Sequence, residues 1–394
     1  MKKGVIRTDI LVVGSGCAGL YCALHLPKDK QVTIITKAEV EKSNSFLAQG
    51  GICMLRDESD YAVFFEDTLK AGHYENDRKS VEIMIRSSQK VINDLISYGA
   101  NFQRDEKGEL AFTKEGAHTH KRIIYHEDTT GKEITRTLLE ETQKQSNISI
   151  HENTTMIDLV GKDNICYGAV VKMKDGTIET IQADFTVIAT GGIGGLYKHS
   201  TNYKHITGDA HAIAKRHGIE LMNMDYVQIH PTTLYTKEGR SFLISESVRG
   251  EGAVLRDKNG NRFVNELLPR DFLTQEIWKQ MEKDGTEYVW EDLRTIPTKE
   301  LIEHFPNIVA HCKEQGYDVT TECIPVVPAQ HYFMGGIKVD YDSKTSMDCL
   351  YAVGEAACNG VHGRNRLASN SLLESLVFAY RAAIDIEKNV KKRG

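Results

Sequence analysis

Apolar and polar positions near the start of the chain follow the order typical of a βα unit. Ile10–Val13 is a continuous apolar run, which predicts a buried strand, and Leu20–Leu24 has the composition of a helix. Between them stands a GxGxxG pattern, which is informative when a strand precedes it and a helix follows. Gly14 would permit the turn, Gly16 would let the backbone approach a pyrophosphate, and Gly19 would let the helix pack closely on the strand. We therefore predict a dinucleotide site at this helix N-terminus; the alternative is a glycine-rich turn without a ligand.

Three further segments identify the dinucleotide. The predicted strand Gln31–Ile35 ends in Thr36 and Lys37, where NAD-binding chains carry an acid for a ribose hydroxyl, and the absence of that acid argues against NAD. Residues 185–192 form an apolar run that enters a glycine-rich loop, and residues 350–357 form another that closes on a glycine and an acid. Together these segments resemble the FAD-binding pattern of two-domain flavoproteins.

The resemblance also predicts the domain organisation. We expect a Rossmann-like α/β FAD-binding domain formed by residues 1–224 and 335–394, with an inserted α+β capping domain at 225–334. Within the insertion, Val254 to Val264 is typical of a hairpin around an Asn-Gly turn, and Asp271 to Lys283 of a helix with Asp271 as its N-cap. Such an insertion would be a lid over a substrate cleft.

Composition narrows the function classes. The 394 residues are 40% hydrophobic and 26% charged, which suits a globular protein with two domains. The net charge of −6 argues against a general nucleic-acid binder, and no apolar run reaches the roughly 20 residues of a membrane span. The N-terminal sequence shows no signal peptide, and the 8 cysteines show no zinc-binding spacing. We expect a reducing, cytoplasmic setting with neither nucleic acid nor membrane as a partner.

A loop at residues 43–51, with the sequence SNSFLAQGG, narrows the flavoprotein family. It resembles the flavin loop of the succinate dehydrogenase, fumarate reductase and L-aspartate oxidase superfamily. In the membrane-bound members a histidine of this loop bonds covalently to FAD, and here Asn44 stands at that position, so we expect non-covalent FAD. Glu355 would hold a ribitol or ribose hydroxyl, or would merely stabilise a helix start. The resemblance assigns cofactor contacts to Gly14, Ser15, Gly16, Ala18, Gly19, Thr36, Lys37, Asn44, Ser45, Ala48, Gln49, Gly50, Gly51, Ala189, Thr190, Gly191, Gly192, Asp209, Glu355, Asn370, Ser371 and Leu372.

The segment SESVRGEG at residues 245–252 resembles the superfamily motif TExxRGEG. Glu246 and Arg249 are three residues apart and would face each other on one helical turn. Twenty-one residues after Arg249 comes Arg270, in the position of the arginine that moves a proton in the superfamily. By resemblance Arg270 is the proton-transferring group and the other two relay the proton to it; singly, each residue is more typical of a surface ion pair.

Two histidines and an arginine complete a predicted carboxylate site. His230 lies in a QxHPT motif, His331 in an HYxxGG motif, and Arg366 in the sequence NRLASNS. By resemblance these three bind substrate carboxylates, and Ser245 adds a hydrogen bond. The chemistry fits, because arginine binds carboxylates in a bidentate manner. A lone histidine is more often a core or surface residue, and Arg364 is the alternative to Arg366.

A loop with the sequence TKEGAHTHKRI at residues 113–123 separates the members of the superfamily. It resembles the loop of L-aspartate oxidases, whereas the succinate and fumarate enzymes carry glutamine in place of Glu115. An amine substrate has an ammonium that a carboxylate would bind, so we expect Glu115 to bind it; a solvated loop acid is the alternative. His118 and His120 have the spacing of metal ligands, but no third ligand is near in sequence, and we expect no metal.

The resemblance implies oxidation of L-aspartate to iminoaspartate by hydride transfer to flavin N5, the first step of NAD biosynthesis from aspartate. Either O2 or fumarate would be the electron acceptor, and quinolinate synthase would be the metabolic partner. The alternatives are a soluble fumarate reductase and a flavoprotein subunit inactive without a partner. Compared with the family, the sequence would lack a C-terminal helical domain, which leaves oligomeric state, acceptor and FAD affinity undetermined.

Overall fold

A five-stranded parallel sheet carries the N-terminal fingerprint. The computed structural model describes residues 5–237 and 240–393. The strand order is β18-β10-β2-β3-β6, and every neighbouring pair is parallel. The strands are β18 (Leu350–Ala352), β10 (Phe185–Ile188), β2 (Ile10–Val13), β3 (Val32–Ile35) and β6 (Ile148–His151). The predicted Rossmann-like α/β fold is therefore confirmed, and one sheet contains strands from both ends of the chain, with β10 between β2 and β18.

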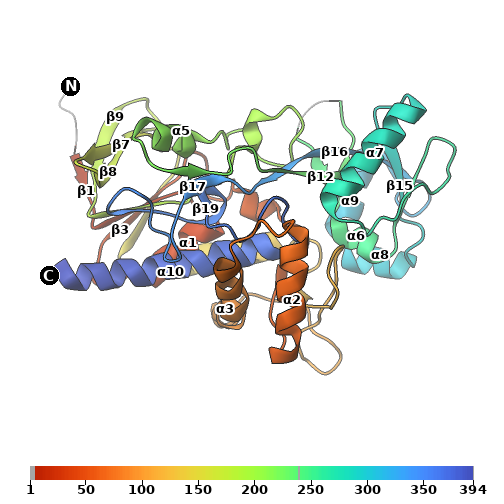
Figure 1. The fold of residues 1–394 in the computed structure, drawn as a ribbon, viewed down its shortest axis with the longest axis horizontal. Coiled ribbons are helices and arrows are strands. Elements are labelled where there is room, and N and C mark those ends of the chain that lie inside the picture. The colour runs from red at the N-terminus through yellow and green to blue at the C-terminus, as the bar shows by residue number, and fades with distance from the viewer. Residues whose placement is uncertain (1–4, 238–239, 394) are drawn as a thin grey trace.

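Alternating side chains of this sheet enter two separate cores, because successive residues of a strand point to opposite faces. Ile10, Val12 and Ile34 join one core with the helices, and Leu11 and Val13 join the other. On the helical face lie α1 (Cys17–His25), α3 (Arg78–Ser97), α4 (Thr130–Gln143) and the long α10 (Asn370–Arg393), and α2 (Glu58–Ala71) packs on α3. In Figure 1, α10 runs lengthwise below the sheet, and α2 and α3 lie beneath its right-hand end.

Short strands cover the second face and extend the FAD-binding part. One sheet has the order β1-β9-β8-β7 and another β11-β17-β19, with α5 (Asp209–Arg216) packed on both. The strands are β1 (Val5–Arg7), β7 (Thr155–Lys162), β8 (Ile165–Lys172), β9 (Ile178–Gln182), β11 (Leu221–Met222), β17 (Gly336–Lys338) and β19 (Ala357–Cys358). A two-stranded ribbon of β4 (Ile52–Cys53) and β5 (Ile123–Ile124) holds the loop at residues 113–123 against the FAD-binding part.

Residues 227–333 contribute a separate antiparallel sheet with the order β13-β12-β16-β15-β14 and a core of its own. Its strands are β12 (Val227–Leu234), β13 (Phe242–Leu243), β14 (Val254–Arg256), β15 (Val289–Asp292) and β16 (Ile324–Phe333). Its helices are α6 (Glu246–Gly250), α7 (Arg270–Asp284), α8 (Thr298–His304) and α9 (Pro306–Glu314). Figure 1 shows these elements gathered at the end opposite β1. We call them the capping elements and their core the capping core; their role as a lid stays a prediction. Residues 1–4, 238–239 and 394 of the predicted domains lie outside the described residues.

Of two local predictions for the insertion, one is confirmed in part and one is wrong. The predicted hairpin is short: the Asp257 N–H donates to the Asn261 carbonyl oxygen at 2.9 Å, Arg256 and Arg262 form one antiparallel bridge, and β14 pairs along its length with β15. The predicted N-cap Asp271 lies inside α7, which begins at Arg270 after Pro269. The Asp271 carboxylate instead accepts hydrogen bonds from other elements and ties the start of α7 to the FAD-binding part.

Candidate active site

A large cavity lies at the carboxyl ends of β2, β3, β10 and β18, between this sheet and the capping elements. This is where open α/β sheets bind ligands. Nearly all of the predicted cofactor contacts line it, namely Gly14, Ser15, Gly16, Ala18, Thr36, Lys37, Asn44, Ser45, Ala48, Gln49, Gly50, Gly51, Ala189, Thr190, Gly191, Asp209, Glu355, Ser371 and Leu372. The predicted substrate contacts Glu115, His230, Ser245, His331 and Arg366 line the same cavity. The fold thus brings residues from many separate stretches of sequence to one site.

The glycines of the fingerprint have the geometry that a phosphate cradle needs. Gly14 has φ +119°, and a Cβ added there would lie 2.1 Å from the carbonyl oxygen of Ala189. Helix α1 starts directly after Gly16 with no side-chain cap and no acid in its first turn. Its positive end therefore faces the cavity without a competing anion, which suits a diphosphate.

Three predicted cofactor contacts lie behind the cavity wall. A Cβ at Gly19 would lie 2.1 Å from the carbonyl oxygen of Gly14, so this glycine allows the close packing of α1. At Gly192 a Cβ would meet the Glu355 carboxylate. The Asn370 side chain donates to the Thr68 hydroxyl, away from the cavity. These positions shape the wall, and their contacts with the cofactor remain predictions.

Several polar groups at the wall fit FAD. The Gln49 Oε1 and Ser43 Oγ atoms are buried without partners among the described residues, and both residues line the cavity. Glu355 accepts a hydrogen bond from the Phe333 N–H at 2.9 Å, and burial raises its pKa to about 7. The amide of Asn44 donates to Asn202 at 2.8 Å and accepts from the Tyr203 N–H at 3.1 Å. This donor and acceptor set, with the glycine cradle, suits a ribityl chain and a diphosphate.

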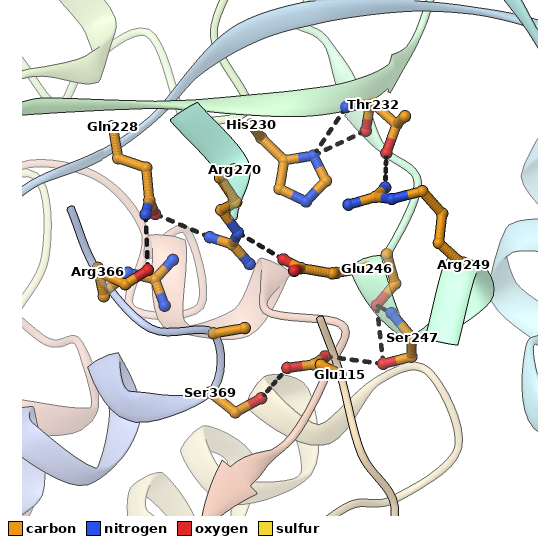
Figure 2. Close-up of polar contacts among 12 residues, drawn as sticks. Glu115, Gln228, His230, Thr232, Glu246, Ser247, Arg249, Arg270, Arg366 and Ser369 are labelled. Atoms are coloured by element: carbon orange, nitrogen blue, oxygen red, sulfur yellow. Dashed lines mark hydrogen bonds and ion pairs between the residues drawn. The ribbon is translucent and has the colours of Figure 1, made fainter. Parts of the chain in front are cut away.

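Arg270 stands at the centre of the predicted catalytic group. Its Nε donates to Glu246 Oε2 at 2.6 Å and its Nη1 to Gln228 Oε1 at 2.8 Å (Figure 2). Both partners are buried. Although burial opposes ionisation, the charges of Arg270 and Arg249 keep the pKa of Glu246 below its ordinary value. A buried, ionised pair therefore faces the cavity.

Arg249 does not face Glu246 as the helical spacing predicts. Its Nη1 donates to the Thr232 hydroxyl and its Nε to the carbonyl oxygen of Glu266 at 3.3 Å. Figure 2 shows its guanidinium beside Thr232, with Glu246 turned toward Arg270. The reason is that α6 is little more than one turn long and ends in the capping core, so packing decides the side-chain direction.

The predicted carboxylate-binding groups converge with unused hydrogen-bonding capacity. The rings of His230 and His331 lie 5.1 Å apart between centroids. Nε2 of His230 and Nε of Arg366 are buried without partners in the described residues. Burial lowers the pKa of both histidines well below the ordinary value, and the Arg270 charge adds to the effect. Burial also lowers the pKa of Arg366, to about 10. Arg366 lines the cavity and Arg364, the alternative, does not.

Glu115 occupies the opposite side of this cluster. Its carboxylate is buried and accepts hydrogen bonds from Ser247 at 2.7 Å and Ser369 at 2.5 Å (Figure 2). Burial, reinforced by the Glu246 charge, raises its pKa. The cavity thus holds two arginines, Arg270 and Arg366, and two carboxylates, Glu115 and Glu246. Groups of both charges can bind a zwitterionic dicarboxylate.

The two histidines with metal-ligand spacing have other partners. His118 contacts the carbonyl oxygen of Ala368 and the Arg122 guanidinium, and His120 pairs with Asp60 at 2.8 Å. Arg122 also binds Asp60 and Asp67, so this buried cluster anchors the loop that carries Glu115. Among residues 5–237 and 240–393, no group of three metal-ligating side chains comes together.

Sequence reasoning missed the residues that orient the functional groups. Gln228, Ser247 and Ser369 hold Arg270 and Glu115 in place. Each of these residues lies inside one of the motifs described above, and that position could have marked it as a candidate. The residue that each one bonds is distant in sequence, so the pairing could not be predicted. Arg240 also lines the cavity, and burial lowers its pKa.

Comparison with known proteins identifies the family of this chain. A family model described as an FAD binding domain matches residues 9–372. The L-aspartate oxidase of Clostridium perfringens is 51% identical over 384 residues, which cover 97% of this chain and 87% of that protein. The L-aspartate oxidase of Clostridium acetobutylicum is 48% identical over 387 residues, or 98% and 89% of the two chains. The chain belongs to the L-aspartate oxidase family.

Solved structures extend this L-aspartate oxidase assignment to the wider superfamily. A mutant of the E. coli quinol fumarate reductase has a TM-score of 0.93 and 30% identity, covering 99% of this chain and 71% of that chain. The open form of a flavocytochrome c3 fumarate reductase has a TM-score of 0.77 and 27% identity, covering 97% and 78%. The predicted membership of the succinate dehydrogenase and fumarate reductase flavoproteins is confirmed. No described helix has the length and hydropathy to cross a membrane.

Proposed function

We propose that this protein is an FAD-dependent oxidoreductase that oxidises L-aspartate to iminoaspartate, the first step of NAD biosynthesis from aspartate. The observation that supports this most directly is the carboxylate of Glu115 opposite Arg270 and Arg366 in one buried cavity. Succinate and fumarate carry no ammonium, so neither would compensate a buried acid at this position. A fumarate reductase is accordingly the weaker candidate.

Substrate recognition follows from the charges of the wall. Arg366 and the imidazoles of His230 and His331 would bind the two carboxylates, with Ser245 adding a hydroxyl donor. Glu115 would bind the ammonium, because its two oxygens keep lone pairs beyond those used by the serine hydroxyls. Opposite charges at both ends would fix the orientation of the substrate, and orientation is a large part of rate enhancement.

Side chains of this protein would accept and move the proton that the reaction releases. When bound, FAD would accept the Cα hydrogen and its electron pair as a hydride at N5. Arg270 would handle the proton, since its Nε is bonded to Glu246 and a proton can move along that bond. Gln228 would hold the guanidinium plane against the cavity. Arg249 would contribute its positive charge, which lowers the pKa of Glu246.

We further propose that FAD is held without a covalent bond. The side chain at the loop position is the amide of Asn44, which is no nucleophile and is bonded to Asn202 and Tyr203. Acid precipitation should release all flavin to the supernatant, and yellow colour left in the washed pellet would contradict the proposal.

The electron acceptor and the metabolic partner are further parts of the proposal. We propose that O2 or fumarate reoxidises the flavin. Because iminoaspartate is unstable in water, rapid use by quinolinate synthase in the cytoplasm is the proposed next step. Cys17, Cys22, Cys53, Cys166, Cys312, Cys323 and Cys358 are free thiols, which is compatible with a reducing compartment.

Anaerobic reduction tests the function. L-aspartate and succinate would be added separately to FAD-loaded protein while the oxidised-flavin absorbance near 450 nm is followed, a property of the cofactor. Bleaching by L-aspartate alone is expected. Bleaching by succinate alone would indicate a dicarboxylate reductase, and no bleaching would indicate a flavoprotein that needs a partner.

A further inference from the structure

Helix α9 of the capping elements begins without a cap of its own. Its N-cap residue, Phe305, has a side chain that forms no hydrogen bond, and the first turn of the helix carries no acid. Pro306, the first helical residue, has no N–H. The N–H groups of Asn307 and Ile308 come next, and neither has a partner within the helix. Because Ile308 is buried, its N–H needs a partner from the protein.

The missing cap comes from Asp128 in the FAD-binding part, 180 residues before Ile308. One carboxylate oxygen, Oδ1, accepts from the Asn307 N–H at 3.1 Å, and the other, Oδ2, accepts from the Ile308 N–H at 2.7 Å. Asp128 is 2% exposed, and burial raises its pKa to about 6, so the carboxylate is still ionised at pH 8. A negative charge at a helix N-terminus adds attraction by the helix dipole to the two hydrogen bonds.

The segment that carries Asp128 also holds the SNSFLAQGG loop, which resembles the flavin loop of the superfamily. The Thr130 hydroxyl donates to the carbonyl oxygen of Gly50 at 2.6 Å. The Gly131 N–H donates to the carbonyl oxygen of Ala48 at 2.9 Å. Asp128, Ala48 and Gly50 all line the cavity. Four consecutive residues therefore bond the flavin loop on one side and a capping helix on the other.

Helix α9 is connected in turn to the helix that carries Glu246. Only Phe305 separates α9 from His304, the last residue of α8. His304 Nδ1 lies 2.8 Å from the carboxylate of Glu251, which directly follows α6. Glu246 begins α6 and bonds Arg270 across the cavity wall. A contact that fixes α9 therefore also fixes the element that positions the predicted catalytic pair.

We propose that Asp128 is a clamp that holds the capping elements closed over the cavity by joining α9 to the flavin loop. The cavity lies between the two parts, so ligands enter and leave more readily when the parts separate. Separation at this edge breaks both hydrogen bonds of Asp128. A ligand that binds only the closed form binds more weakly when less of the protein is closed. Asp128 acts through α9 and is a positioning residue; the inference takes its substrate from the proposed function but uses no property of the amine.

The test measures ligand release from FAD-loaded protein at pH 8 in wild type, Asp128→Ala and Asp128→Asn. Fumarate dissociation, followed by stopped-flow flavin absorbance, should be about tenfold faster in Asp128→Ala, within the roughly 2- to 30-fold shift that loss of a helix cap produces. KM for L-aspartate should rise about tenfold, while flavin reduction at saturating L-aspartate should change less than about twofold, because the closed form keeps its geometry. Asp128→Asn keeps one acceptor oxygen and should be intermediate.

Asp57→Ala is the matched control. Asp57 caps α2 through the Ser59 N–H at 2.9 Å, within the FAD-binding part, so its loss should lower the melting temperature and leave ligand release unchanged. Unchanged fumarate release in Asp128→Ala, or the same acceleration in Asp57→Ala, would overturn the inference. If Asp128→Ala does not load FAD, Asp128→Asn is judged by the same comparison.

FAD release separates this inference from the proposed function. Followed by flavin fluorescence after dilution, it requires no substrate, and it should be faster in Asp128→Ala or Asp128→Asn than in wild type and Asp57→Ala. If L-aspartate does not reduce the wild type, the proposed function fails and FAD release still decides on the clamp. Equal FAD release in all of these proteins would then overturn it.

Discussion

Replacement of Glu115 by glutamine removes the proposed ammonium partner with almost no change in shape. Both serine hydroxyls that now donate to the carboxylate can rotate, so the amide can still be hydrogen-bonded by Ser247 and Ser369. The change is therefore confined to the charge. It tests the feature that favours an amine substrate over succinate or fumarate.

The expected loss follows from burial. Glu115 is 3% exposed, and an ammonium bound there would be taken out of water. Breaking a buried ion pair by removing one partner costs about 3–5 kcal/mol. The Ser247 and Ser369 hydroxyls already donate to the Glu115 carboxylate, and the charge of Glu246 raises the pKa of Glu115. We therefore take the lower end of this energy range. About 3 kcal/mol corresponds to about a 150-fold fall in kcat/KM for L-aspartate.

The assay is steady-state turnover of L-aspartate beside the Kd of fumarate, measured by flavin absorbance. Kd for fumarate should stay the same or fall, because a negative charge leaves the site. Glu109→Gln, an exposed acid on the preceding loop, is the matched control and should change neither value. If Glu115→Gln lowers kcat/KM by less than about fivefold, or weakens both ligands equally, Glu115 does not bind the amine.

Three further changes test the frame of the site. Arg122→Met takes the guanidinium away from buried Asp67 and from buried Asp60, which keeps only His120, so the free energy of unfolding in urea should fall by about 3–5 kcal/mol; a loss under about 1 kcal/mol would refute the assigned role. Gly14→Ala puts a methyl 2.1 Å from the Ala189 carbonyl oxygen and should abolish FAD retention in gel filtration, while Gly99→Ala, also at positive φ but in open space, should retain FAD. Burial raises the pKa of Glu355 to about 7 from 4.5, so the folded state binds more protons between these values and stability falls as pH rises through them. In FAD-free protein, Glu355→Gln should make the melting temperature fall less between pH 4.5 and 7, and an unchanged slope would argue against this linkage.

The sequence by itself determined the features that depend on local pattern and spacing. The apolar run Ile10–Val13, the glycines after it and the helix that follows are adjacent in the chain, so their order alone predicts the βα unit. The long motifs around Glu246, His331 and Arg366 identify the superfamily, because many residues at fixed spacing are rarely matched by chance. The family and the fold class were therefore predictable.

Only the tertiary structure decided where side chains point and which partners they find. Helical spacing placed Arg249 against Glu246, but packing in the capping core turned it toward Thr232. Burial and hydrogen bonding depend on segments that are far apart in sequence: Ser369 lies 254 residues from the Glu115 carboxylate that it binds. Burial and hydrogen-bond partners are properties of the packed molecule, which spacing along the chain does not encode.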